Sequence, residues 1–206
     1  MNKGKFITFE GGEGTGKSTQ VNLLCNSLID AGIKVIRTRE PGGTMTGEKI
    51  REILVKGKAD KISPVTELLL NFAARKEHLE KVIKPTLAIG DFLVSDRFTD
   101  SSIAYQGFAH GLGKEFVNSI ADLIIGNFKP DLTLIFDIEV EKGLGRTIRR
   151  KHNENRYESM ETQFHEKVRE GFLSILENEP ERCVLIDASK SISDVHSDVI
   201  ALVMKG

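Results

Sequence analysis

Glycines, a lysine and a serine are grouped near the start of this 206-residue chain in a way that suits phosphate chemistry. Residues 11–18 read Gly-Gly-Glu-Gly-Thr-Gly-Lys-Ser and match the pattern G-x-x-x-x-G-K-[ST]. Glycines there let the backbone curl, so that successive N–H groups point into one anion-binding concavity. Lys17 can reach the β- and γ-phosphates of a nucleoside triphosphate, and the Ser18 hydroxyl can ligate Mg²⁺. The residues predicted to bind the triphosphate are Gly11, Gly12, Glu13, Gly14, Thr15, Gly16, Lys17, Ser18 and Thr19.

An acid and an arginine, Asp96 and Arg97, follow the apolar run 92–95. In open parallel sheets the carboxyl ends of the strands face the ligand crevice, so both side chains are expected beside the phosphate loop. Asp96 can position Mg²⁺, and Arg97 can neutralise phosphate charge. Asp137 also ends an apolar run and competes for the metal role, although Asp96 is favoured by its neighbour. A surface ion pair explains Asp96 and Arg97 equally well.

Two further segments carry polar groups that could hold a second substrate. Residues 37–44 read Arg-Thr-Arg-Glu-Pro-Gly-Gly-Thr, which is either a turn with solvated charges or a loop at the crevice, with Glu40-Pro41 a candidate cis peptide. Residues 71–75 read Asn-Phe-Ala-Ala-Arg, and their spacing alone favours Phe72 in the core and a solvated Arg75. The alternative stacks a base on Phe72 with Arg75 at its polar edge.

The elements that must position these residues alternate along the chain. Short, almost continuously apolar runs predict strands buried on both faces at 6–9, 33–38, 92–95, 132–136 and 184–186. Helical patterns lie at 18–31, 46–55, 64–89, 115–126, 141–151, 158–176 and 192–204, and the pattern 64–89 is expected to be broken or kinked near Pro85. This alternation predicts an α/β fold, with a five-stranded, mostly parallel sheet and helices on both faces.

Composition limits the class of protein. The chain is long enough for one domain over residues 1–206, and its formal net charge of -1 gives no sign of a nucleic-acid-binding surface. Cys25 and Cys183 cannot form a disulfide framework and are expected in the core. No apolar run approaches the roughly 20 residues of a membrane span, and no signal peptide is visible. We therefore expect a cytoplasmic protein without membrane or nucleic-acid partners.

A basic, polar segment connects the last two helical patterns before the final strand. Residues 146–156 read Arg-Thr-Ile-Arg-Arg-Lys-His-Asn-Glu-Asn-Arg. A solvated helix end is the simple interpretation of such a run. Beside a phosphate site, a mobile cationic lid over about 143–157 is the better hypothesis.

Together these segments resemble the thymidylate kinase family over nearly the whole chain. The resemblance is carried by 9–19 (Phe-Glu-Gly-Gly-Glu-Gly-Thr-Gly-Lys-Ser-Thr), 38–44, 72–75 (Phe-Ala-Ala-Arg), 95–98 (Ser-Asp-Arg-Phe) and 104–107 (Ala-Tyr-Gln-Gly). The run Arg-Glu-Pro-Gly-Gly-Thr is the most specific to this family. The resemblance implies a three-layer P-loop nucleoside monophosphate kinase fold, phosphorylation of dTMP to dTDP by ATP with Mg²⁺, and a homodimer.

The resemblance also implies roles for single residues. Phe72 would stack on thymine, Arg75 would bond the base, and Tyr105 would crowd the 2′ position of the sugar. Glu13 would lie near the 3′-hydroxyl, and arginines would hold the acceptor phosphate. The residues implied for dTMP are Glu13, Arg39, Pro41, Arg51, Phe72, Arg75, Arg97, Ser101, Ser102, Tyr105 and Gln106, with Ser18 and Asp96 for the metal.

Members of this family place catalytic arginines either in the phosphate loop or in the lid. This phosphate loop has none, whereas the lid segment is rich in arginine, so the chain resembles the bacterial type with lid arginines. The catalytic residues implied are Lys17, Arg97, Arg150 and Arg156. Three other functions stay open: another nucleoside monophosphate kinase, a P-loop ATPase switch, and a nucleotide-binding module without turnover.

Overall fold

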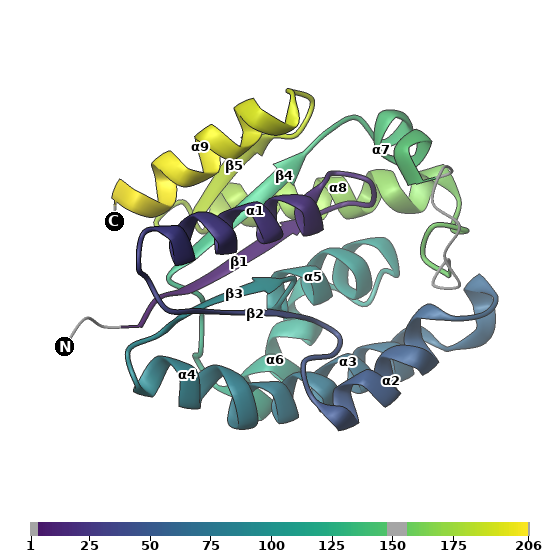
Figure 1. The fold of residues 1–206 in the computed structure, drawn as a ribbon. Coiled ribbons are helices and arrows are strands. Elements are labelled where there is room, and N and C mark those ends of the chain that lie inside the picture. Colours follow the sequence, from purple (N-terminus) through teal and green to yellow (C-terminus); the bar gives the residue numbers. More distant parts are fainter. Residues whose placement is uncertain (1–3, 148–155, 206) are drawn as a thin grey trace.

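A computed structural model describes residues 4–147 and 156–205 of the chain (Figure 1). Five parallel strands form one sheet in the order β2-β3-β1-β4-β5. The strands are β1 (Phe6–Gly11), β2 (Val35–Arg39), β3 (Phe92–Asp96), β4 (Leu132–Asp137) and β5 (Cys183–Asp187). All five predicted strands are confirmed, and the sheet is entirely parallel among the described residues.

Helices cover both faces of the sheet, as the sequence predicts (Figure 1). The α-helices are α1 (Lys17–Asp30), α2 (Met45–Val55), α3 (Pro64–His78), α4 (Lys84–Ala88), α5 (Thr99–Ser102), α6 (Lys114–Ile125), α7 (Val140–Thr147), α8 (Thr162–Asn178) and α9 (Ile192–Lys205). Shorter turns are the 3-10 turn η1 (Ala59–Lys61) and the π-helical turns η2 (Leu79–Ile83) and η3 (Ile103–Ala109).

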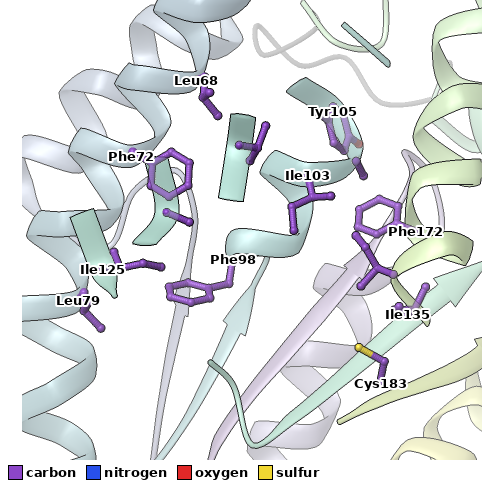
Figure 2. Close-up of a cluster of buried hydrophobic side chains, with 14 of the residues drawn as sticks. Leu68, Phe72, Leu79, Phe98, Ile103, Tyr105, Ile125, Ile135, Phe172 and Cys183 are labelled. Atoms are coloured by element: carbon purple, nitrogen blue, oxygen red, sulfur yellow. The ribbon is translucent and has the colours of Figure 1, made fainter. Parts of the chain in front are cut away.

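The strands send alternate side chains to two separate cores, because side-chain direction in a strand has a period of two. On β1, Ile7 and Phe9 join the core under α1 and α9, whereas Phe6 joins the core on the opposite face. Figure 2 shows this second core, where Phe72 from α3 and Tyr105 from η3 lie in one apolar layer with Phe98. Two residues predicted to hold the acceptor, Phe72 and Tyr105, therefore belong to the second core.

The carboxyl ends of the strands meet at one edge of the sheet. Phe9 pairs with Asp96, Arg39 pairs with Asp96, and Gly11 pairs with Phe136 in the strand register. The phosphate loop, Asp96 and the segment after β2 are thus side by side. Their common position follows from the parallel order of β2, β3 and β1.

Pro85 interrupts the long helical pattern 64–89. The expected irregularity near Pro85 takes the form of the π-helical turn η2 between α3 and α4. Proline cannot donate the backbone hydrogen bond of a regular turn and clashes with the carbonyl four residues earlier, and the wider turn before it relieves both problems.

One predicted helix start is wrong, and one helical segment was not predicted. The last long helix before β5 begins at Thr162 rather than 158, and the region Thr99–Ala109 is helical although its sequence mixes polar residues with glycine. Burial of this segment against α8 overrides its weak local preference. The part of the predicted lid at 148–155 lies outside the described residues.

Both cysteines are free and buried, as predicted. Burial raises the pKa of Cys25 to about 11 and that of Cys183 to about 12, so both remain thiols. Within the described ranges, none of the helices combines the length and apolar character that crossing a membrane requires.

Candidate active site

The phosphate loop between β1 and α1 is shaped by glycines with positive φ. Gly14 has φ 69°, and a Cβ added there would clash with the backbone oxygen of Gly143 in α7. Gly11 has φ 137°, and its added Cβ would clash with the Phe136 oxygen. Only glycine fits positions that need both this backbone conformation and such close contact. The loop is therefore pressed between β4 and α7.

The ammonium group of Lys17 lies inside this loop. Its Nζ donates hydrogen bonds to the Gly11 oxygen at 2.9 Å, the Gly12 oxygen at 2.5 Å and the Thr15 hydroxyl at 3.0 Å. Burial, together with the positive charge of Arg97, lowers the pKa of Lys17 to about 8. A buried ammonium group held by oxygen atoms of an anion-binding loop can exchange these partners for the terminal phosphates of a triphosphate.

Ser18 and Asp96 come together as predicted, because the Ser18 hydroxyl donates to Asp96 Oδ2 at 2.6 Å. A hydroxyl next to a carboxylate fits Mg²⁺, which takes a few protein oxygens and completes its shell with phosphate and water. Asp137, the competing acid, instead accepts two hydrogen bonds from Arg169 at 2.7 and 2.8 Å. The geometry therefore favours Asp96 for the metal.

Arg97 connects the phosphate loop with the helical segment after β3. Its guanidinium donates to the Gly11 oxygen at 2.9 Å and to Glu13 at 2.9 Å, and also to Ser101 and Tyr105 at 3.1 and 3.0 Å. Its backbone has φ 74°, an unfavourable value for a residue with a side chain. Strain of this kind is found where the surrounding structure holds a functional residue in place.

Glu13 lies opposite Arg97 and accepts a hydrogen bond from the Tyr105 hydroxyl at 2.7 Å. Burial by itself would raise the pKa of Glu13, but the charges of Arg97 and Lys17 outweigh it and lower that pKa. Glu13 is therefore a carboxylate at neutral pH. It can accept a hydrogen bond from a substrate hydroxyl.

Arg75 is buried, contrary to the simple interpretation of a solvated residue. Its Nε donates to Glu40 at 2.7 Å, its Nη1 to Ser102 at 3.0 Å and its Nη2 to the Phe98 oxygen at 2.9 Å. His78 contacts the other Glu40 oxygen at 2.9 Å. Sequence reasoning missed Glu40, whose only signal was an acid among crevice arginines, and the peptide Glu40-Pro41 is cis as considered.

Two cavities adjoin at this edge of the sheet. One, of about 170 Å³, is lined by the phosphate loop together with Arg39 and Asp96. The other, of about 120 Å³, lies toward α3 and η3. Four residues belong to the lining of both cavities, namely Glu13, Glu40, Arg51 and Arg97.

Most residues predicted for the acceptor line the smaller cavity. They are Glu13, Pro41, Arg51, Arg75, Arg97, Ser101, Ser102, Tyr105 and Gln106. Arg39 instead lines the phosphate cavity, half exposed and paired with Glu48 at 2.8 Å. Asn71, Val55, Tyr157 and Glu158 also line the smaller cavity, and only tertiary packing brings them there.

Phe72 is placed differently from the predicted stacking position. Its ring is 0% exposed, and the Arg75 guanidinium covers it at 4.6 Å from the ring centre. In this structure the ring supports Arg75 from below, and Arg75 forms the cavity wall. Direct stacking of a base on Phe72 needs Arg75 to move.

Arg156 corrects the predicted set of catalytic lid arginines. Its side chain is 0% exposed and pairs with Glu67 at 2.6 Å, while it donates to the backbone oxygens of Leu54 and Ala59 at 3.1 and 3.0 Å. Arg156 therefore fastens the chain after the lid to α2 and α3 rather than facing the phosphate loop. Arg150 lies outside the described residues.

Known proteins resemble this chain over almost its full length. The family model described as thymidylate kinase matches residues 9–199. The chain belongs to the thymidylate kinase family. A thymidylate kinase of Magnetococcus marinus is 46% identical over 197 residues, which cover 96% of this chain and 94% of that protein.

Other members of the family agree. A thymidylate kinase of Caulobacter vibrioides is 46% identical over 205 residues, covering 100% of this chain and 98% of the relative. The crystal structure of thymidylate kinase from Ehrlichia chaffeensis has a TM-score of 0.78 and 36% identity, covering 97% of this chain and 98% of the other. The α/β fold with its P-loop is thus shared by thymidylate kinases.

Proposed function

We propose that this protein transfers the γ-phosphoryl group of ATP to dTMP and forms dTDP, a step in the synthesis of dTTP. Membership of the thymidylate kinase family gives the activity. The observation that carries the site assignment is the junction of two cavities at Glu13, Glu40, Arg51 and Arg97. Ligands held in the two cavities would meet at these shared residues, where a phosphoryl group could pass from one to the other.

On the donor side, the phosphate loop and Lys17 bind the ATP phosphates. Ser18 and Asp96 would hold Mg²⁺, which neutralises charge on the β- and γ-phosphate oxygens when it is bound. Lys17 supplies positive charge where negative charge develops on the phosphate oxygens during transfer. The chain performs little covalent chemistry and acts mainly by positioning.

On the acceptor side, Arg97 would hold the dTMP phosphate, because it lines both cavities and its guanidinium is fixed by Glu13 and Tyr105. Arg51 adds positive charge at the same junction, and Arg39 adds it in the phosphate cavity. Glu13, fixed by Arg97, accepts from the 3′-hydroxyl, while Tyr105 closes the 2′ side of the sugar. Arg75 and Gln106 then face the base.

The lid arginine assigned to catalysis is Arg150. Arg150 lies outside the described residues, and it is chosen because it follows α7 in the sequence, whose Gly143 packs on the phosphate loop. Arg150→Ala should lower kcat by about 100-fold with little change in KM for dTMP, because the charge is needed only in the transition state. An effect confined to KM would remove Arg150 from the transition state.

We also propose a homodimer in a reducing, cytoplasmic setting. The packed helices α3 and α6 expose Val65 at 42%, Leu69 at 48% and Phe116 at 42%, which suits a face covered by a second copy. The free thiols of Cys25 and Cys183 agree with a reducing compartment. Light scattering during size-exclusion chromatography measures the mass, and a monomer would contradict the dimer.

The decisive experiment mixes the protein with ATP, Mg²⁺ and one nucleoside monophosphate at a time. Diphosphate formed mainly from dTMP supports the proposal. Diphosphate formed mainly from another monophosphate would replace the substrate, and ATP loss without an acceptor would support an ATPase switch.

A further inference from the structure

Glu67, on α3, is a fully buried carboxylate that the proposed reaction does not use. It is 0% exposed and does not line the acceptor cavity, yet it accepts a hydrogen bond from a residue that does. That residue is Gln106, whose Nε2 donates to Glu67 Oε1 at 2.7 Å. Glu67 thus lies directly behind one wall of the pocket.

The contact fixes which end of the Gln106 amide faces the cavity. An ionised carboxylate only accepts hydrogen bonds, whereas a glutamine amide carries donors on its nitrogen and an acceptor on its oxygen. The nitrogen must therefore turn toward Glu67, and the oxygen is left for the other side. Gln106 is 2% exposed, so its side chain has little freedom to arrange itself otherwise.

The surroundings of Glu67 keep it ionised. Burial alone would raise its pKa, but His110, Arg156 and Gln106 together outweigh burial and lower the pKa below its usual value. Arg156 Nη2 lies 2.6 Å and His110 Nε2 lies 3.3 Å from the carboxylate oxygens. These two partners reach Glu67 from segments outside α3, so the charge is set by the tertiary fold.

Arg75 supplies hydrogen-bond donors that complement the Gln106 acceptor. A guanidinium has five N–H donors, and in this structure three of the Arg75 donors are directed to Glu40, Ser102 and Phe98. Two Arg75 donors remain, and Arg75 and Gln106 both line the same 120 Å³ cavity. A donor beside an acceptor matches the O4 and N3–H edge of thymine, whereas cytosine presents an amino group and an unprotonated N3.

We propose that Glu67 is a positioning and specificity residue, which holds the Gln106 amide with its oxygen toward the base and thereby makes the pocket reject cytosine. This inference rests on the proposed function, because it assumes that a pyrimidine occupies the acceptor cavity. Glu67 acts through Gln106 and does not contact the substrate.

The test compares kcat/KM for dTMP and dCMP. In Glu67→Gln the side chain at this position can donate as well as accept, so the Gln106 amide can turn and offer its nitrogen to cytosine N3. The dTMP/dCMP ratio should fall at least about 10-fold, as expected when a buried hydrogen-bond pair no longer has one orientation. An unchanged ratio would overturn the inference.

Two further variants separate orientation from structural support. In the double variant Glu67→Gln with Gln106→Glu, the amide introduced on α3 donates, and the carboxylate introduced on η3 keeps an acceptor toward the base. The ratio should therefore return toward the wild-type value. Arg156→Lys keeps a charge beside Glu67 but loosens the packing after the lid. It should lower Tm and leave the ratio unchanged, and a ratio as low as in Glu67→Gln would assign the effect to packing.

If Glu67→Gln does not fold, as judged by circular dichroism, Gln106→Met decides. It removes the acceptor but keeps the volume, and it should lower kcat/KM for dTMP about 10-fold or more while that for dCMP changes little. An equal fall for both nucleotides would overturn the inference. A wild-type protein without dTMP kinase activity would instead contradict the proposed function itself.

Discussion

The phosphate loop and the acceptor pocket adjoin each other, but backbone groups form most of the first and side chains form the second. The loop is one continuous segment between β1 and α1, and backbone N–H groups, glycine conformations and one lysine make its binding surface. The pocket is assembled from segments that are far apart in the chain: Glu13 of the phosphate loop, α2, α3, α5, η3, the loops after β2 and β3, and residues 157–158. Its polar groups are buried charges that hold one another in place.

This difference teaches where each region is vulnerable. The phosphate loop should tolerate changes in the surrounding side chains, because its binding surface depends on its glycines and on Lys17. The pocket depends on pairs such as Glu40 with Arg75, in which removal of one partner leaves the other buried without compensation. Mutations should therefore change catalysis in the first region and stability together with substrate affinity in the second.

The largest effect is expected from Lys17→Ala. Loss of the only cation inside the described phosphate loop should lower kcat by about 1,000-fold, because it removes charge stabilisation of the transferring group. Thermal unfolding should change little, which would distinguish the loop from the pocket. Steady-state kinetics and Tm measure both, with the exposed Lys34→Ala as control. Near-normal turnover would contradict the assignment of this loop to the phosphates of ATP.

Arg97 tests the junction between the two regions. Arg97→Lys keeps the charge but loses the fork that reaches Gly11, Glu13 and Tyr105. We expect kcat to fall about 100-fold and KM for dTMP to rise about 10-fold, because one residue serves both cavities. If only one of the two constants changes, Arg97 belongs to a single region.

A further test compares two glutamates, Glu40 in the loop after β2 and Glu48 in α2, whose ion pairs differ in burial. Glu40→Gln breaks the ion pair with Arg75, in which both side chains are almost fully buried, and should destabilise the protein by about 3 kcal/mol and raise KM for dTMP. Its control, Glu48→Gln, breaks the exposed pair with Arg39 and should cost about 1 kcal/mol or less. Urea unfolding measures both, and equal losses would contradict the comparison.

The smallest effect concerns pH. Because burial lowers the pKa of Lys17 to about 8 in the free protein, kcat/KM for ATP should fall a few-fold as pH rises through this value and the ammonium loses its proton. Burial, assisted by Asp100, also raises the pKa of Glu10 to about 8, so Glu10 titrates in the same range. Lys17→Arg separates the two, since arginine stays charged. A fall that persists in this variant would point to Glu10.

The sequence by itself determined the phosphate loop, the five strands and the family resemblance. A contiguous motif between a strand and a helix carries its own geometry, because glycine conformations and helix direction are local properties. The sequence also predicted that Asp96 and Arg97 lie at the edge of the sheet where the phosphate loop is, because the carboxyl ends of parallel strands meet at one edge.

Only the tertiary structure decided the arrangement of the pocket. Arg156 was predicted as a catalytic lid residue but is buried against Glu67, which lies far earlier in the chain, on α3. Glu40 and Arg75 are likewise 35 positions apart. Which buried charges meet depends on how α2, α3 and η3 pack over the sheet. Burial then makes each such pair obligatory, because an unpaired charge is costly away from water.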